Sequence, residues 1–84
     1  MIMNEVFEMD KIYEILGNLH PEFDYRDSSD FIADGLLDSF DVVTLVIELE
    51  VNYNILIDAL DILPENFNSV VAIADVVKKN GGAS

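Results

Sequence analysis

The sequence predicts a small all-helical domain, and three observations lead to that prediction. Apolar residues recur at helical spacing over residues 4–18 and again over residues 70–79. The chain has 84 residues and is 51% apolar, which is enough for one small hydrophobic core. A further apolar segment, 39–53, lies between the two, although its pattern alone fits either a helix or a strand. We expect one domain over residues 1–80 and a disordered tail at 81–84.

The composition restricts the possible partners. Seventeen acidic residues oppose four basic ones, giving a formal net charge of −13. Such a surface repels nucleic acids and anionic membranes and attracts basic patches on other proteins, although acidity can also serve solubility alone. No signal stretch opens the chain and no apolar run could span a bilayer, so we expect a cytoplasmic protein without membrane insertion. The absence of cysteine excludes disulfides, thiolate metal sites and a cysteine nucleophile.

The first helix is expected over residues 4–18. Asn4 is a suitable N-cap, and either Gly17 or the His20-Pro21 pair would end the helix, because a residue before proline is pushed out of the helical region. The apolar face would contain Val6, Met9, Ile12, Tyr13, Leu16 and Leu19.

A long connection follows, over residues 20–38. Loops of this length are unusual in a small domain and are often functional. We expect some of its apolar side chains to contact the core, namely Phe23, Tyr25, Phe31 and Ile32. Its acids lack the glycine and late glutamate of a calcium-binding EF-hand loop, so we expect a solvated loop without a metal site.

The segment 39–53 is the ambiguous one. Residues 47–55 alternate between apolar and polar, as a half-buried strand does. Ser39 and Asp41, however, look like a helix cap and a first-turn acid. One helical stripe would contain Val42, Leu45, Val46, Leu49 and Tyr53. A second helical stripe would contain Phe40, Val43 and Ile47.

The end of the chain is predicted more simply. Residues 55–57 form a short extended run, and residues 64–67, which begin with proline, form a short helical turn. Asn68 or Ser69 would cap a final helix over residues 70–79. Its inward face would contain Val70, Ile73, Ala74 and Val77.

Taken together, these segments resemble the acyl carrier protein family. The family motif is Asp-Ser-Leu, whose serine carries 4′-phosphopantetheine. Here the motif reads Asp-Ser-Phe, at the end of the run Asp34-Gly35-Leu36-Leu37-Asp38-Ser39-Phe40. The phenylalanine variant, the acidic block at 47–50, the run at 53–57 and Phe67 look more like D-alanyl carriers and stand-alone peptidyl carriers.

The resemblance covers nearly the whole chain, most specifically residues 31–77, and implies a fold. That fold is an all-α four-helix bundle with three long helices and one short helix, and with a long loop between helices 1 and 2. It makes residues 39–53 the second helix and residues 64–67 the short third helix.

The resemblance also implies a modification site at Ser39. Phosphopantetheine from coenzyme A would be attached there and would hold an acyl or aminoacyl cargo as a thioester. The chain lacks a thiol, so the sulfur would have to come from such a group. A helix start exposes the hydroxyl and tolerates the added negative charge. Asp38 would cap the helix or help the metal site of the transferase, and Gly35 would allow a turn. The alternative is that Ser39 is an ordinary N-cap.

The second stripe is expected to bind partner enzymes. A surface helix normally has one apolar stripe, so Phe40, Val43 and Ile47, with the acids Asp41 and Glu48, suggest a docking face. The alternative places Val43 in the core and leaves only Ile47 exposed. The partners implied are a phosphopantetheinyl transferase, a ligase that loads the cargo, and downstream acyl-using enzymes. We expect the carrier to be a monomer.

Two further expectations concern the class of protein. Thr44 and Val51 stand where fatty-acid carriers commonly have acids, which favours a specialised biosynthetic pathway. We expect no catalytic activity, because nothing in the sequence orients His20 as a base for Ser39. The alternative function is an unmodified acidic helical adaptor that binds a basic protein.

Overall fold

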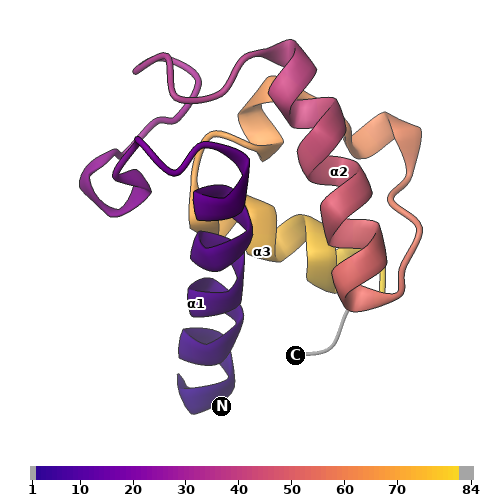
Figure 1. Cartoon of the computed structure of the whole chain (residues 1–84). Coiled ribbons are helices and arrows are strands. Elements are labelled where there is room, and N and C mark those ends of the chain that lie inside the picture. The colour runs from indigo at the N-terminus through magenta and orange to yellow at the C-terminus, as the bar shows by residue number, and fades with distance from the viewer. Residues whose placement is uncertain (1, 82–84) are drawn as a thin grey trace.

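The computed structural model describes the backbone of residues 2–81 and the side chains of residues 9–81. Within that part of the chain the fold is all-helical, with three α-helices and no strand: α1 (Ile2–Leu19), α2 (Ser39–Tyr53) and α3 (Val70–Lys79) (Figure 1). The all-α prediction is therefore confirmed, and the strand interpretation of the second half of α2 is wrong.

The three helices share one core. Figure 1 shows α1 and α2 on either side of the molecule, with α3 crossing between them, and α1 contacts both of the other helices. The connection 20–38 joins the end of α1 to the start of α2. This arrangement puts the first turn of α2 beside the long connection.

The short third helix that the resemblance implied is present only as a 3-10 turn, η3 (Pro64–Asn66). Phe67 N–H donates to Pro64 O at 3.0 Å, three residues back, and the φ of Phe67 is −128°, outside the helical range. Two other 3-10 turns, η1 (Tyr25–Asp27) and η2 (Ala59–Asp61), lie in the two connections. The prediction of four α-helices is therefore not confirmed.

Helix α1 begins earlier than predicted. It begins at Ile2, so Asn4 lies within the helix and the predicted N-cap there is wrong. Its other end is at Leu19, one residue beyond the predicted bound and directly before the His20-Pro21 pair, so the alternative end at Gly17 is wrong. His20 N–H donates to Leu16 O at 3.1 Å.

Helix α2 has the predicted bounds. Its C-cap is Asn54, which has left-handed φ and ψ of 55° and 51° and donates its N–H to Glu50 O. The Glu50 carboxylate accepts a hydrogen bond from Ile57 N–H at 2.9 Å, so this acid organises the chain after the helix. One stripe of α2 is buried, namely Val42, Leu45, Val46 and Leu49. The alternating pattern was misleading because Val51 is apolar yet exposed.

Helix α3 also has the predicted bounds, and its N-cap is Ser69 rather than Asn68. Ser69 Oγ accepts a hydrogen bond from Ala72 N–H at 3.1 Å, whereas Asn68 O accepts one from Phe31 N–H at 2.7 Å. The predicted inward residues Val70, Ile73, Ala74 and Val77 are all buried.

The long connection is fixed to this core by its aromatic residues. Tyr25 and Phe31 are buried and meet edge to face with their ring centroids 5.2 Å apart, while Phe23 lies at the surface. The Tyr25 hydroxyl donates to Leu36 O at 3.3 Å. The segment that leads into α2 is therefore fixed by Phe31 in the core and by the hydrogen bond from Tyr25 to Leu36.

None of the helices over residues 2–81 has both the length and the apolar character that crossing a membrane requires. Gly81 follows α3 with a φ of 91°. The rest of the predicted tail, residues 82–84, lies outside the described residues.

Candidate functional site

Asp38 and Asp41 form the N-terminal cap of α2. Asp38 Oδ1 accepts a hydrogen bond from Asp41 N–H at 2.8 Å, and Asp41 Oδ2 accepts one from Asp38 N–H at 3.1 Å. This reciprocal pair is a capping box, and carboxylates also suit the positive end of the helix dipole. The N-cap is therefore Asp38, and the interpretation of Ser39 as the cap is wrong.

Ser39 is the first helical residue, and its side chain is exposed. No hydrogen bond involves its hydroxyl within the part of the chain that the structure describes. The first intrahelical bond runs from Val42 N–H to Asp38 O at 3.0 Å, so the N–H groups of Ser39 and Phe40 lie before it without intrahelical acceptors. An exposed hydroxyl thus stands beside two backbone donors.

The backbone before the site is tightly folded. Phe31 O accepts hydrogen bonds from both Leu36 N–H at 2.8 Å and Leu37 N–H at 3.1 Å. Gly35 lies in this turn with a φ of 76°, a conformation that glycine adopts without steric cost, as predicted. Leu37 is buried one residue before the N-cap. The segment that presents Ser39 is therefore anchored to the core.

His20 also contacts the start of α2. Its Nε2 lies 2.9 Å from Asp41 Oδ1, and its Nδ1 lies 3.6 Å from a carboxylate oxygen of Glu22. The hydrogen bond to Asp41 raises the pKa of His20, against the effect of burial. Burial acts to raise the pKa of Asp41, but the hydrogen bonds from Asp38 N–H and His20 outweigh it, so that pKa is lowered. Sequence reasoning missed this pairing because no spacing rule relates residues 21 positions apart.

A stripe of exposed apolar side chains runs along α2 from its first turn. Phe40 is 80% exposed, Val43 52%, Ile47 53% and Val51 73%, and we call these four residues the α2 stripe. The alternative in which Val43 belongs to the core is wrong. Val51 was not predicted as part of this face, although its position four residues after Ile47 was a signal for it.

The predicted acids of the site lie with the stripe on the same helix. Asp41 is half-buried in the capping box, and Glu48 is exposed. Three of the four cations make contacts away from the first turn of α2. Lys11 lies 4.7 Å from the ring centroid of Tyr53, at the C-terminal end of α2, and Arg26 and Lys79 form ion pairs with Asp10 and Asp61.

Three acids of the long connection have local structural roles. Asp24 accepts from Arg26 N–H, Asp30 accepts from Ile32 N–H and Ala33 N–H, and Asp34 accepts from Ser28 Oγ–H. Over the residues whose side chains are described, no three acidic or histidine side chains lie close enough to share a metal ion.

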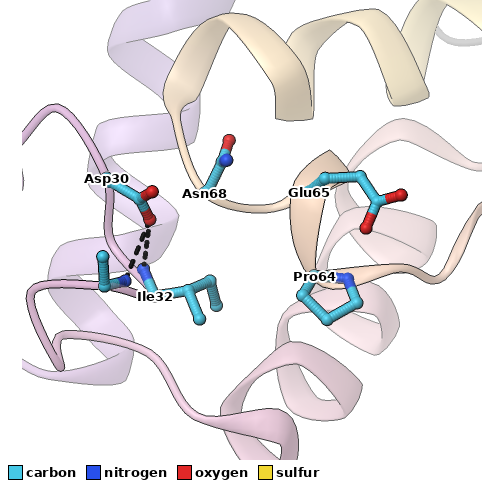
Figure 2. Close-up of a pocket in the computed structure, with 6 residues that line it drawn as sticks. Asp30, Ile32, Pro64, Glu65 and Asn68 are labelled. Carbon is cyan, nitrogen blue, oxygen red and sulfur yellow. Dashed lines mark hydrogen bonds between the residues drawn. The ribbon is translucent and has the colours of Figure 1, made fainter.

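An open depression of about 310 Å³ lies between the long connection and η3. Figure 2 shows its lining, in which Asp30 points to the backbone N–H groups of its own turn and Glu65 lies on the opposite wall. Ser39 does not line it. Sequence reasoning did not predict this depression, because its two walls are more than 30 positions apart in the chain. Its lining residues are Asp30, Ile32, Ala33, Pro64, Glu65 and Asn68.

No family model, curated protein or solved structure matches the chain. The start of α2 is therefore the feature from which we infer a function.

Proposed function

We propose that the chain is an acyl or aminoacyl carrier protein that is modified with 4′-phosphopantetheine at Ser39. In this proposal the fold is the carrier bundle, with η3 at the place of the family's short third helix and the long connection as its first loop. The carrier has no catalytic activity of its own. It acts in the cytoplasm as a monomer that meets one enzyme after another.

The observation that carries the proposal is the division of roles between Asp38 and Ser39. Serines before helices usually accept a hydrogen bond from the helix backbone. Here Asp38 accepts that bond, and Ser39 is left exposed at the first helical position. A hydroxyl in this position is available to a modifying enzyme without loss of the cap.

The residues around Ser39 suit a phosphodiester. The backbone N–H groups of Ser39 and Phe40 are donors at the positive end of the helix dipole, which favours a bound anion. In the modification the Ser39 Oγ–phosphorus bond forms and the pyrophosphate bond of coenzyme A breaks. The nucleotide part of coenzyme A leaves, and the hydroxyl proton passes to a base of the transferase. Once attached, the group supplies the thiol on which a carrier holds its cargo as a thioester.

The α2 stripe is the proposed docking face. Its apolar side chains begin next to Ser39, and Asp38, Asp41 and Glu48 lie along the same helix. A partner that combines apolar side chains with basic residues would match this face in shape and charge. The partners are a phosphopantetheinyl transferase, a loading ligase and downstream acyl-using enzymes. Thr44 and Val51, at positions where fatty-acid carriers commonly have acids, favour a specialised pathway.

The test is incubation of the full chain with coenzyme A and a promiscuous phosphopantetheinyl transferase, followed by an intact mass. We expect the wild-type mass to increase by one prosthetic group and the mass of Ser39→Ala to stay unchanged. An unmodified wild-type protein would contradict the proposal. The intact mass of protein isolated from its native cells would in addition reveal an attached cargo.

A second candidate is an unmodified acidic adaptor, which the exposed α2 stripe and the net charge of −13 also favour. An adaptor would bind its basic partner equally well after Ser39→Ala. Its affinity would fall as salt screens the charges. A carrier instead loses its function with the hydroxyl.

A further inference from the structure

His20 connects the end of α1 to the first turn of α2. Its backbone N–H donates to Leu16 O at 3.1 Å, which fixes it at the end of α1. Its ring lies 5.4 Å from the Phe23 ring, centroid to centroid, and its Nε2 reaches Asp41 Oδ1 at 2.9 Å. The same Asp41 carboxylate accepts the Asp38 N–H through its other oxygen. One carboxylate therefore joins His20 to the capping box beside Ser39.

The geometry around the ring favours the imidazolium. An ionised carboxylate only accepts hydrogen bonds, so the ring nitrogen that faces Asp41 carries a proton. In the neutral ring the lone pair would then be on Nδ1, which lies 3.6 Å from Glu22 Oε2. That lone pair and the Glu22 carboxylate would repel each other. A second proton, on Nδ1, replaces the repulsion with an attraction between opposite charges.

The charged and titratable groups near His20 are mostly acidic. Asp41 and Asp38 act on it from the start of α2, and Glu22 acts from the connection. The Tyr25 phenol lies near the same acids, but burial raises its pKa to about 12, so it stays neutral where His20 titrates. The dipole of α2 opposes a cation at this end of the helix. The hydrogen bond to Asp41 and the charges of the three carboxylates outweigh burial, so the pKa of His20 is raised.

We propose that His20 is a positioning residue of the Ser39 site, which in its imidazolium form holds the first turn of α2 against the end of α1 through Asp41. This inference rests on the proposed function for its consequence at Ser39, but the contact itself can be tested without any modification.

The dependence on pH follows from the direction of the shift. A group whose pKa is raised in the folded protein contributes stability that is fully present below its ordinary value, which is 6.5 for histidine. That contribution is lost as the pH rises through the raised pKa. The start of α2 is therefore held most firmly in mildly acidic solution and less firmly above the pKa of His20.

The first experiment measures the contact on the full unmodified chain by NMR. The His20 ring signals and the backbone amides of Asp38 and Asp41 are followed across a pH titration. We expect the ring to titrate above 6.5 and both amides to shift with the same midpoint. In Asp41→Asn the midpoint should fall. A ring that titrates at the ordinary value, or amides that do not follow the ring, would overturn the inference.

The second experiment measures the consequence at Ser39. The rate of phosphopantetheine transfer is compared between wild type and His20→Gln, which keeps a neutral N–H donor, and the ratio of the two rates is taken at each pH so that the transferase's own titration cancels. We expect wild type to be about two- to fivefold faster below the pKa of His20, the range that one partly exposed ion pair supports. The ratio should approach one above that pKa.

A ratio that does not change with pH would overturn the positioning role. If wild type is not modified at any pH, the proposed function fails, and the NMR titration still decides whether His20 holds α2.

Discussion

Asp38 and Asp41 accept hydrogen bonds from each other's backbone N–H across the first turn of α2. The nitrogen–oxygen distance is 2.8 Å to Asp38 Oδ1 and 3.1 Å to Asp41 Oδ2. Ser39 lies between them in sequence and takes no part in either bond. This relationship separates the residue that starts the helix from the residue that we propose is modified. Stability and modification should therefore respond to different substitutions.

Asp38→Ala should destabilise the protein, and Ser39→Ala should not. Loss of an N-cap carboxylate costs about 1 kcal/mol, whereas substitutions at exposed sites stay within about 0.5 kcal/mol. Urea unfolding of the two variants beside wild type measures the difference. A larger loss in Ser39→Ala than in Asp38→Ala would mean that the serine is the cap after all.

Because the second half of α2 is helical, alanine substitutions there should differ sharply in their effect on stability. Leu49 is fully buried, so Leu49→Ala should lower the free energy of unfolding by about 2–5 kcal/mol. Ile47→Ala and Val51→Ala remove exposed side chains and should change it by about 0.5 kcal/mol or less. In a strand these three residues would share one face and cost similar amounts. Similar losses in all three variants would therefore contradict the helix.

The α2 stripe should matter for partner binding but not for folding. Phe40→Ala and Ile47→Ala should raise the KM of the transferase for the carrier by about fivefold or more, equivalent to the ~1 kcal/mol that an interface anchor loses on truncation. Leu60→Ala is the matched control, because Leu60 is an exposed leucine that belongs to η2 and not to the α2 stripe. Steady-state kinetics with intact-mass detection gives the values. An equal effect of Leu60→Ala would show that the stripe has no special role.

The pair of Asp61 and Lys79 should make stability sensitive to acid. Lys79 Nζ donates to Asp61 Oδ1 at 2.7 Å, and this hydrogen bond, with a second one from Asn80, lowers the pKa of Asp61. A carboxyl group whose pKa is lowered in the folded protein contributes stability at pH values above its ordinary pKa of 3.8. That stability is lost as the pH falls through the lowered pKa.

Asp61→Asn should therefore be less stable than wild type at neutral pH, and the two should converge in acid. Thermal unfolding between neutral pH and pH about 2 measures this, since that interval spans the ordinary carboxyl pKa. Asp75→Asn, at an exposed position on α3, is the control. A constant difference between Asp61→Asn and wild type at every pH would contradict the role of the ion pair.

Much of the fold could be predicted because local rules decide it. The bounds of α3 follow from its cap and apolar spacing, and Pro21 marks the end of α1. Residues 39–53 fit a helix or a strand on local pattern alone, and only the resemblance to the carrier family favoured the helix. The region around Pro64 could not be predicted so well. The turn that begins at Pro64 does not continue as an α-helix, because it ends at Phe67. The side chain of Phe67 is buried in the core, and its backbone φ lies outside the helical range. That is a tertiary effect, which local propensity does not contain.

The position of the candidate site could be predicted from the sequence, but the hydrogen bonds between its side chains could not. The motif places Ser39 at a helix start, and helical spacing places Phe40, Val43 and Ile47 on one face. The sequence offered Asp38 and Ser39 as possible caps, and only the geometry assigns the cap to Asp38. The contact between His20 and Asp41 depends on how the long connection folds back, which no local pattern records.

The most direct test of the central claim locates the modification. The full chain is treated with coenzyme A and a phosphopantetheinyl transferase, and fragment mass spectrometry identifies the modified residue. Ser39→Ala is measured beside Ser69→Ala, in which the serine that caps α3 is removed instead. We predict one phosphopantetheine on Ser39 in wild type and in Ser69→Ala, and none in Ser39→Ala. An unmodified wild type, or modification at another residue, would contradict the account.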